Sequence, residues 1–127
     1  MNLDRHGRND VINYVIENDT SKLEASAFSH DEINHRDMNG WTALHFAAQA
    51  QNADIAGILL STGAEVDVED EYGNTPLFKA VFNYRNSGNI IELLLKAGAD
   101  PDNNNRYGVS PRKLAFTIAN YDARRFF

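Results

Sequence analysis

The sequence predicts an all-α fold, a solenoid of about four helix–turn–helix units that form a single domain over residues 1–127. Two observations predict it. Four glycines recur at separations of 33, 33 and 35 residues, namely Gly7, Gly40, Gly73 and Gly108. Similar residues follow each glycine, and a second phrase recurs later in the two central units. A fixed period of this length is typical of repeat architectures.

The first recurring phrase begins a helix in each central unit. Thr42 and Thr75 are placed to act as N-caps that accept hydrogen bonds from free helix N–H groups, and Pro76 suits the first helical position. Each helix is expected to be about two turns long, which is too short to be stable alone. Its apolar side must therefore pack on neighbouring units. The expected apolar stripe comprises Leu44, Ile55, Leu59, Leu77, Ile90 and Leu94.

The second phrase, at residues 58–67 and 93–102, ends a helix. Gly63 and Gly98 follow the last leucines, where the chain must turn left-handed, a conformation that glycine adopts without strain.

Together the two phrases resemble the ankyrin repeat, with its Gly-x-Thr-Pro-Leu-His-x-Ala-Ala opening and its Leu-Leu-x-x-Gly-Ala-Asp close. The units at 37–69 and 70–104 match almost throughout, and those at 4–36 and 105–127 match in part. The resemblance implies short β-hairpin-like fingers between units. It also implies that the first unit and the truncated last unit act as caps.

Both caps are expected to depart from the repeat. In the first unit, a second helix over roughly residues 21–29 should end irregularly, because His30 stands in place of the closing glycine. In the last unit, Arg112 occupies a position where leucine usually packs. We expect Tyr121, Phe126 and Phe127 to fold back over the last apolar face.

Composition restricts the partners. The net charge of −6 argues against a nucleic acid or an anionic membrane, since both require a basic face. Residues 105–127 carry +4, so residues 1–104 carry −10. The sequence has no cysteine, no apolar run of transmembrane length and no signal-peptide pattern, and we therefore expect a cytoplasmic protein.

Candidate catalytic groups have structural explanations. His30, His35 and Asp37 could form a metal pair or an acid–base dyad, but their spacing fits no known ligand motif, so a surface turn is favoured. The resemblance implies that His45 hydrogen-bonds between turns. The acidic stretch at 65–71 lacks the spacing of an EF-hand loop and is read as a solvated loop or a contact patch. We expect no enzyme activity, no metal and no cofactor.

Aromatic residues indicate a binding surface. Trp41, Tyr72 and Tyr107 flank the repeat glycines and should lie at the fingers. Aromatic side chains with a polar group are over-represented where interfaces concentrate their energy. The resemblance implies a concave binding face made of finger tips and first helices. Carried over residue by residue, that face comprises Met38, Asn39, Trp41, Gln49, Ala50, Glu71, Tyr72, Asn74, Phe82, Asn83, Arg106, Tyr107 and Val109.

We therefore expect a monomeric protein–protein interaction module. Its size, acidity and resemblance suggest the small free-standing bacterial ankyrin proteins, some of which are immunity proteins that neutralise a toxin, here one with a basic surface. One alternative is a generic adaptor or regulator of a cytoplasmic enzyme. Another is a metal-binding or hydrolytic protein that uses His30, His35 and Asp37. A third is self-assembly through the Phe126-Phe127 end.

Overall fold

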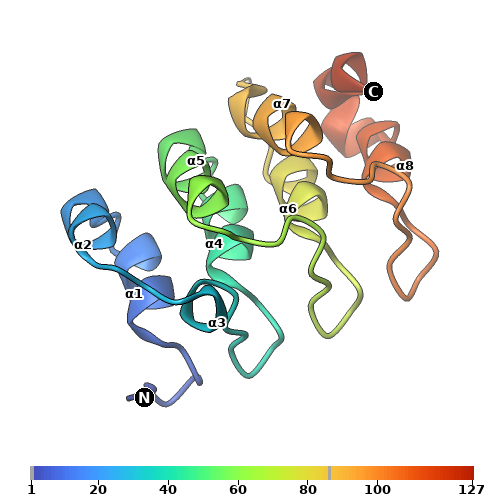
Figure 1. The fold of residues 1–127 in the computed structure, drawn as a ribbon. Coiled ribbons are helices and arrows are strands. Elements are labelled where there is room, and N and C mark those ends of the chain that lie inside the picture. Colours follow the sequence, from blue (N-terminus) through green and yellow to red (C-terminus); the bar gives the residue numbers. More distant parts are fainter. Residues whose placement is uncertain (1, 86) are drawn as a thin grey trace.

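Paired helices stack side by side to form the fold (Figure 1), which we describe from a computed structural model that covers residues 2–85 and 87–127, without the side chains of 118–121. The first helices of successive units pack in one row: α1 (Asp10–Ile16), α4 (Ala43–Gln49), α6 (Pro76–Phe82) and α8 (Pro111–Ala115). The second helices α2 (Thr20–Ala25), α5 (Ala53–Ser61) and α7 (Asn89–Lys96) form the other row. A short helix, α3 (His30–Ile33), and a 3₁₀ helix, η1 (Ile118–Phe126), complete the order.

Each first helix begins at an equivalent polar cap. The side chains of Asn9, Thr42, Thr75 and Ser110 all accept a hydrogen bond from the backbone N–H three residues later. These bonds satisfy donors that a helix start otherwise leaves free. The two predicted threonine caps and the position of Pro76 are confirmed.

The core runs continuously between the two rows. All six residues of the predicted stripe are at most 1% exposed. Alanines such as Ala47, Ala48 and Ala80 are fully buried, so the backbones of neighbouring helices can approach closely. Gly63 and Gly98 have φ values of +106° and +97°, which confirms the left-handed turns after the second helices.

The fingers between units are tight turns joined to one another. In the finger that connects α5 to α6, Asp70 Oδ1 accepts from the backbone N–H groups of Tyr72 and Asn74, each at 2.9 Å. Asp4, Asp37 and Asn105 make the same pair of bonds at their equivalent positions. Backbone bonds also link adjacent fingers, from Glu71 N–H to Asn39 O at 3.0 Å and from Arg106 N–H to Tyr72 O at 2.9 Å. Within the described ranges the fingers are hairpin-like turns, and no residue lies in a strand.

The first unit differs from its prediction. Its second helix ends at Ala25, four residues early, because Ser26 is extended at φ −101° and ψ 141°. Instead of ending a helix, His30 begins α3, whose cap Ser29 forms a capping box with Glu32. The expected span of 21–29 was therefore wrong at its C-terminal end, although the irregular ending was predicted.

The C-terminal segment closes the other end of the stack. Phe126 and Phe127 are half-buried against the core, and the Phe126 ring packs against Gly88 and Tyr84. Arg112 donates to Asp102 Oδ1 at 2.8 Å and to the Phe127 carbonyl at 3.1 Å, which ties α8 to the chain end. The predicted packing of these two phenylalanines on the core is confirmed, whereas the side chain of Tyr121 lies outside the described residues.

No helix in the described ranges has both the length and the apolar character needed to cross a membrane.

Candidate binding groove

The predicted binding residues gather on the side of the stack formed by the first helices and the fingers. Nine of them are exposed: Met38, Asn39, Gln49, Ala50, Glu71, Tyr72, Phe82, Arg106 and Tyr107. Trp41, Asn74, Asn83 and Val109 are half-buried. Phe82 is 63% exposed and therefore belongs to the surface.

Two adjacent hollows form a groove on this side. The larger, the central hollow, has a volume of about 400 Å³ and includes five predicted residues, Asn39, Trp41, Gln49, Glu71 and Tyr72. The smaller, the apolar hollow, has a volume of about 220 Å³ and lies against Val15, Ile16 and Ala50. Both hollows share Arg8, Phe46 and Gln49, so they lie side by side. A hollow of about 480 Å³ beside the C-terminal cap contains none of the predicted residues.

A ladder of two aromatic rings with a cation at each end lines the central hollow. The guanidinium of Arg8 lies 5.3 Å from the Phe46 ring centre. The Phe46 and Trp41 rings are 4.7 Å apart, and Lys79 Nζ lies 4.2 Å from the Trp41 ring. Cations at these distances are attracted by the negative face of an aromatic ring. The ladder therefore joins three consecutive units through their surface side chains.

Sequence reasoning missed Arg8, Phe46 and Lys79, although the repeat contains a signal for them. Arg8 and Trp41 both directly precede a first-helix cap, and Phe46 and Lys79 both lie four residues after one. The structure pairs Arg8 with Phe46 and Trp41 with Lys79, a separation of 38 residues in both cases. A search for complementary residues at this offset would have found both pairs.

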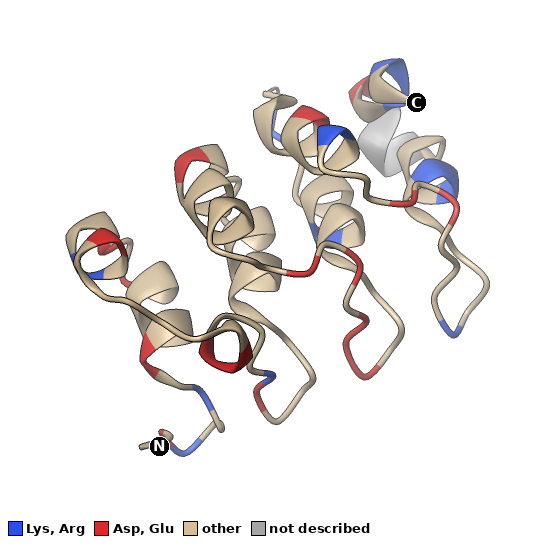
Figure 2. Ribbon diagram, in the orientation of Figure 1, with Lys and Arg blue, Asp and Glu red and all other residues tan. Residues whose placement is uncertain are grey.

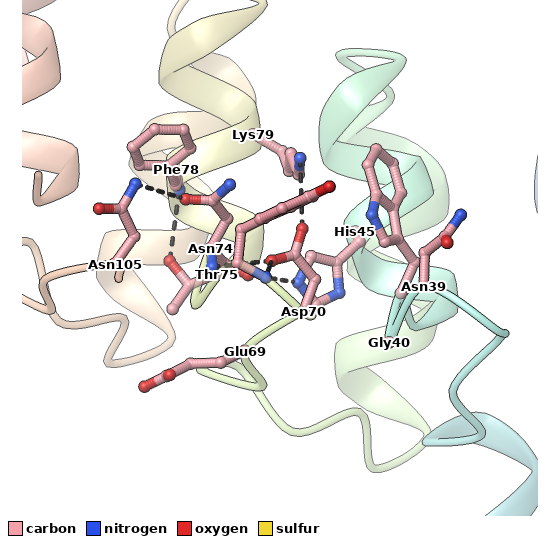
Figure 3. A network of polar contacts seen from close by, with 12 residues as sticks. Asn39, Gly40, His45, Glu69, Asp70, Asn74, Thr75, Phe78, Lys79 and Asn105 are labelled. Carbon is pink, nitrogen blue, oxygen red and sulfur yellow. Dashed lines mark hydrogen bonds and ion pairs between the residues drawn. The ribbon is translucent and has the colours of Figure 1, made fainter. Parts of the chain in front are cut away.

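A buried ion pair anchors the ladder to a finger. Lys79 Nζ lies 3.4 Å from Asp70 Oδ2, and the side chains are 15% and 0% exposed (Figure 3). Because Asp70 also accepts two backbone N–H groups, its carboxylate holds the finger and the first helix α6 in one fixed relation.

His45 joins two units beneath the ladder (Figure 3). Its Nδ1 accepts from the backbone N–H of Thr42 at 3.0 Å, so its Nε2 carries the proton and donates to the Asn74 carbonyl at 2.8 Å. Burial lowers the pKa of His45 to about 4, because a charged imidazole would lose its hydration. The predicted structural role of this histidine is confirmed.

The finger tips carry a second aromatic group. The Tyr72 and Tyr107 rings stack with their centres 6.5 Å apart and are 48% and 74% exposed. Met38, at the tip of the preceding finger, is 73% exposed.

Asn74 and Asn83 face inward in part. Asn74 accepts from Asn105 Nδ2 at 2.9 Å, and Asn83 donates to the Lys79 carbonyl at the end of α6.

The residues of the metal or hydrolytic alternative serve separate turns. His35 Nε2 bonds the Gly7 carbonyl at 2.7 Å, whereas Asp37 holds its own finger. His30 is exposed beside Asp31 and Glu65. In the part of the chain that the structure describes, no three His, Cys, Asp or Glu side chains gather in a way that could hold a metal ion.

The acidic stretch at 65–71 lies along the finger that leads to α6 (Figure 2). Asp67 accepts the Asp100 N–H at 3.1 Å, and partial burial raises the pKa of its carboxyl. Glu69 Oε2 accepts from Asn103 at 3.3 Å. Two of these acids thus bond the following unit, while Glu71 is exposed at the groove.

A stack of helix pairs with one hollowed face of first helices and fingers is a repeat scaffold for binding. The chain belongs to the ankyrin-repeat family, because the family's sequence model, described as ankyrin repeats in three copies, matches residues 5–105. Ankyrin repeats are protein–protein interaction modules, and this is the class of the chain.

Related proteins are much longer. Human BCL-6 corepressor-like protein 1 is 37% identical over 87% of this chain and 6% of its own length. The mouse B-cell lymphoma 3 protein homolog is 37% identical over 75% of this chain and 22% of its own. Serine/threonine-protein kinase 12 of Arabidopsis thaliana is 37% identical over 61% of this chain and 17% of its own. The chain thus spans less than a quarter of each of these relatives.

Proposed function

We propose that the groove formed by the central and apolar hollows is the surface on which this module binds its partner protein. One observation carries the proposal. Five residues chosen for their place in the repeat lie together in one hollow, and the adjoining apolar hollow is lined by the exposed side chain of Ile16. Interface energy concentrates at such aromatic groups when they line a cavity that a partner can fill. The remaining predicted residues extend this surface along the finger tips and helix ends.

The partner we propose is a toxin, which the chain would neutralise in the cytoplasm as an immunity protein. The net charge of −6 supports a partner with a basic surface, because opposite net charges accelerate encounter. The resemblance to small bacterial ankyrin proteins supports the same role. Binding over the toxin's active site would then block its activity.

Co-expression tests this role. The product of the neighbouring gene in the source organism is expressed with and without this chain, and growth and co-purification are measured. The proposal expects the neighbour to be toxic alone, and toxicity to be relieved in step with complex formation. A pair that neither associates nor restores growth contradicts it.

A regulatory adaptor is the second candidate, and the relatives favour it. One of them is named as a corepressor-like protein, and its match covers 87% of this chain. An adaptor would bind a cellular enzyme or regulator and leave the neighbouring gene's product unaffected. Co-purification from the native organism therefore separates the two candidates by the identity of the protein recovered.

We also propose that the chain is monomeric, with Phe126 and Phe127 acting as a cap. Their half-buried position against the core supports this. Light scattering should give one mass at all concentrations, whereas a mass that rises with concentration would indicate a dimer at this end.

A further inference from the structure

Arg8 stands at the centre of the groove with unused hydrogen-bonding capacity. It contributes to both hollows, and its guanidinium rests against Phe46 at 5.3 Å. Its Nε–H is buried and has no hydrogen-bond partner among the described residues. A buried donor without an acceptor costs roughly 1–3 kcal/mol. The Nε–H is shielded from solvent, so a ligand reaches the guanidinium through its Nη groups, which are not buried and make no hydrogen bond with the described residues.

Lys79 is the second cation of the central hollow. Its Nζ contacts the Trp41 ring and one oxygen of Asp70, which leaves further N–H donors free. The hollow also contains three acids. Asp37 and Asp70 are 8% and 3% exposed and are bonded to their own fingers, so Glu71 is its one exposed acid.

We propose that the partner protein anchors in this groove through an acidic side chain next to an apolar one. The carboxylate bonds the Arg8 guanidinium in the central hollow, on the side that faces Lys79. The apolar neighbour fills the apolar hollow, against Ile16, Phe46 and Ala50. This inference rests on the proposed function, since it names the chemistry of the partner at the same groove.

Charge and shape favour this occupant. Arg8 lies where a polar hollow meets an apolar one, so the acceptor and the apolar group must be adjacent in the ligand. A volume of about 220 Å³ has room for one leucine or phenylalanine side chain. A guanidinium binds a carboxylate through charge-assisted hydrogen bonds, which are stronger than neutral ones.

A polyanion fits poorly. Glu71 lines the same hollow, and Glu69 lies on the same finger, so a run of phosphates that follows the groove would meet like charge. One isolated carboxylate at Arg8 avoids them. The net negative charge of the chain is also compatible with this anchor. The rate of encounter depends on the summed charge of the molecule, whereas the binding of one carboxylate depends on the N–H donors nearest to it.

A random dodecapeptide library displayed on phage supplies the probe. Peptides that bind the unmodified chain are selected first. A selected peptide is then retained for the next step if Ala50→Arg abolishes its binding and Ala97→Arg does not. The two alanines are exposed helix C-caps of nearly equal geometry, with φ −77° and ψ −2° against φ −78° and ψ −1°, but only Ala50 lines the groove. The retained peptides therefore bind beside Ala50, which lines the apolar hollow and also a third hollow of about 350 Å³ with Asn52 and Asp54, and sensitivity to Arg8→Gln then assigns a peptide to the groove.

The anchor is then tested with Arg8→Gln. The retained peptides should share an Asp or Glu beside a large apolar residue, and Arg8→Gln should weaken their binding by about tenfold or more. Arg85→Gln, which removes the same charge from an exposed loop, should change it less than twofold. Replacing the shared peptide acid by its amide should have little further effect on the Arg8→Gln protein. Lys79 is not varied, because it also neutralises Asp70.

Several results would overturn the anchor. These are a library that yields no groove-bound peptide, retained peptides without a shared acid, and equal losses with Arg8→Gln and Arg85→Gln. The anchor would also be overturned if a short oligonucleotide bound the chain more tightly than these peptides and lost that binding with Arg8→Gln. The co-expression test is independent, since a toxin could bind this groove without an acid, and the anchor could serve a partner that is not a toxin.

Discussion

His45 shows how one residue can support the stack and make it sensitive to pH. Its ring bridges two units through Thr42 and Asn74, and burial lowers its pKa to about 4. An unfolded chain has an ordinary histidine pKa near 6.5 and so binds a proton first as the pH falls. The contribution of His45 is therefore complete above about pH 6.5 and is lost progressively towards pH 4.

We predict that the free energy of unfolding falls by up to about 1.4 kcal/mol per pH unit from this group between pH 6 and 4.5. Urea unfolding at several pH values measures the slope. His45→Gln should be less stable at pH 7 but have a shallower slope over the same range. Equal slopes in the two proteins would show that other groups cause the pH dependence.

Lys79 has a comparable structural role at the groove. Lys79→Met leaves the Asp70 carboxylate buried without its cation, and removing one partner of a buried pair is strongly destabilising. We expect a loss of about 3 kcal/mol in the free energy of unfolding. Lys96→Met, at an exposed position at the end of α7, should change it by less than about 0.5 kcal/mol. Similar effects of the two substitutions would mean that the Asp70 pair is dispensable.

Among the elements, those defined by a cap and a closing glycine could be predicted from the sequence. The helices α4, α5, α6 and α7 begin or end where Thr42, Gly63, Thr75 and Gly98 indicate. The first unit could not be predicted to the same precision. In α2 only Leu23 is buried, so packing defines its C-terminal end weakly, and the local capping box at Ser29 begins a new helix instead.

Substituting alanine at two glycines tests how closely the neighbouring side chains pack at each position. A Cβ at Gly88 would clash with the Phe126 ring, whereas one at Gly57, inside α5, would meet no atom within 4 Å. Gly88→Ala should displace the C-terminal cap and cost about 1–3 kcal/mol. Gly57→Ala should add about 0.5–1 kcal/mol, because alanine is the better helix former. Thermal unfolding measures both, and stabilisation by Gly88→Ala would contradict the packing of Phe126.

At the scale of the whole molecule, the main helix-to-helix contacts among the described residues join neighbouring units, so both the core and the ladder are built from contacts that repeat along the stack. The candidate binding face was placed by carrying the resemblance over residue by residue, since finger and first-helix positions recur every 33 residues or so, and its role in binding stays a prediction. The ladder could not be predicted from single residues, because Arg8 and Lys79 taken one at a time look like ordinary surface charges. Their aromatic partners, Phe46 and Trp41, lie on the adjacent unit and are found only when the side chains of neighbouring units are placed beside each other.

The central claim is that the groove on the first helices and fingers binds the partner. The most direct measurement compares proteins recovered from the native organism with the unmodified chain, with Ala50→Arg and with Ala97→Arg, quantified by mass spectrometry. All three chains should unfold at similar urea concentrations, since both alanines are exposed. We predict that the partner is recovered equally with the unmodified chain and Ala97→Arg and is lost with Ala50→Arg. A partner that is retained by Ala50→Arg and lost with Ala97→Arg would place the binding surface on the second helices and contradict the account.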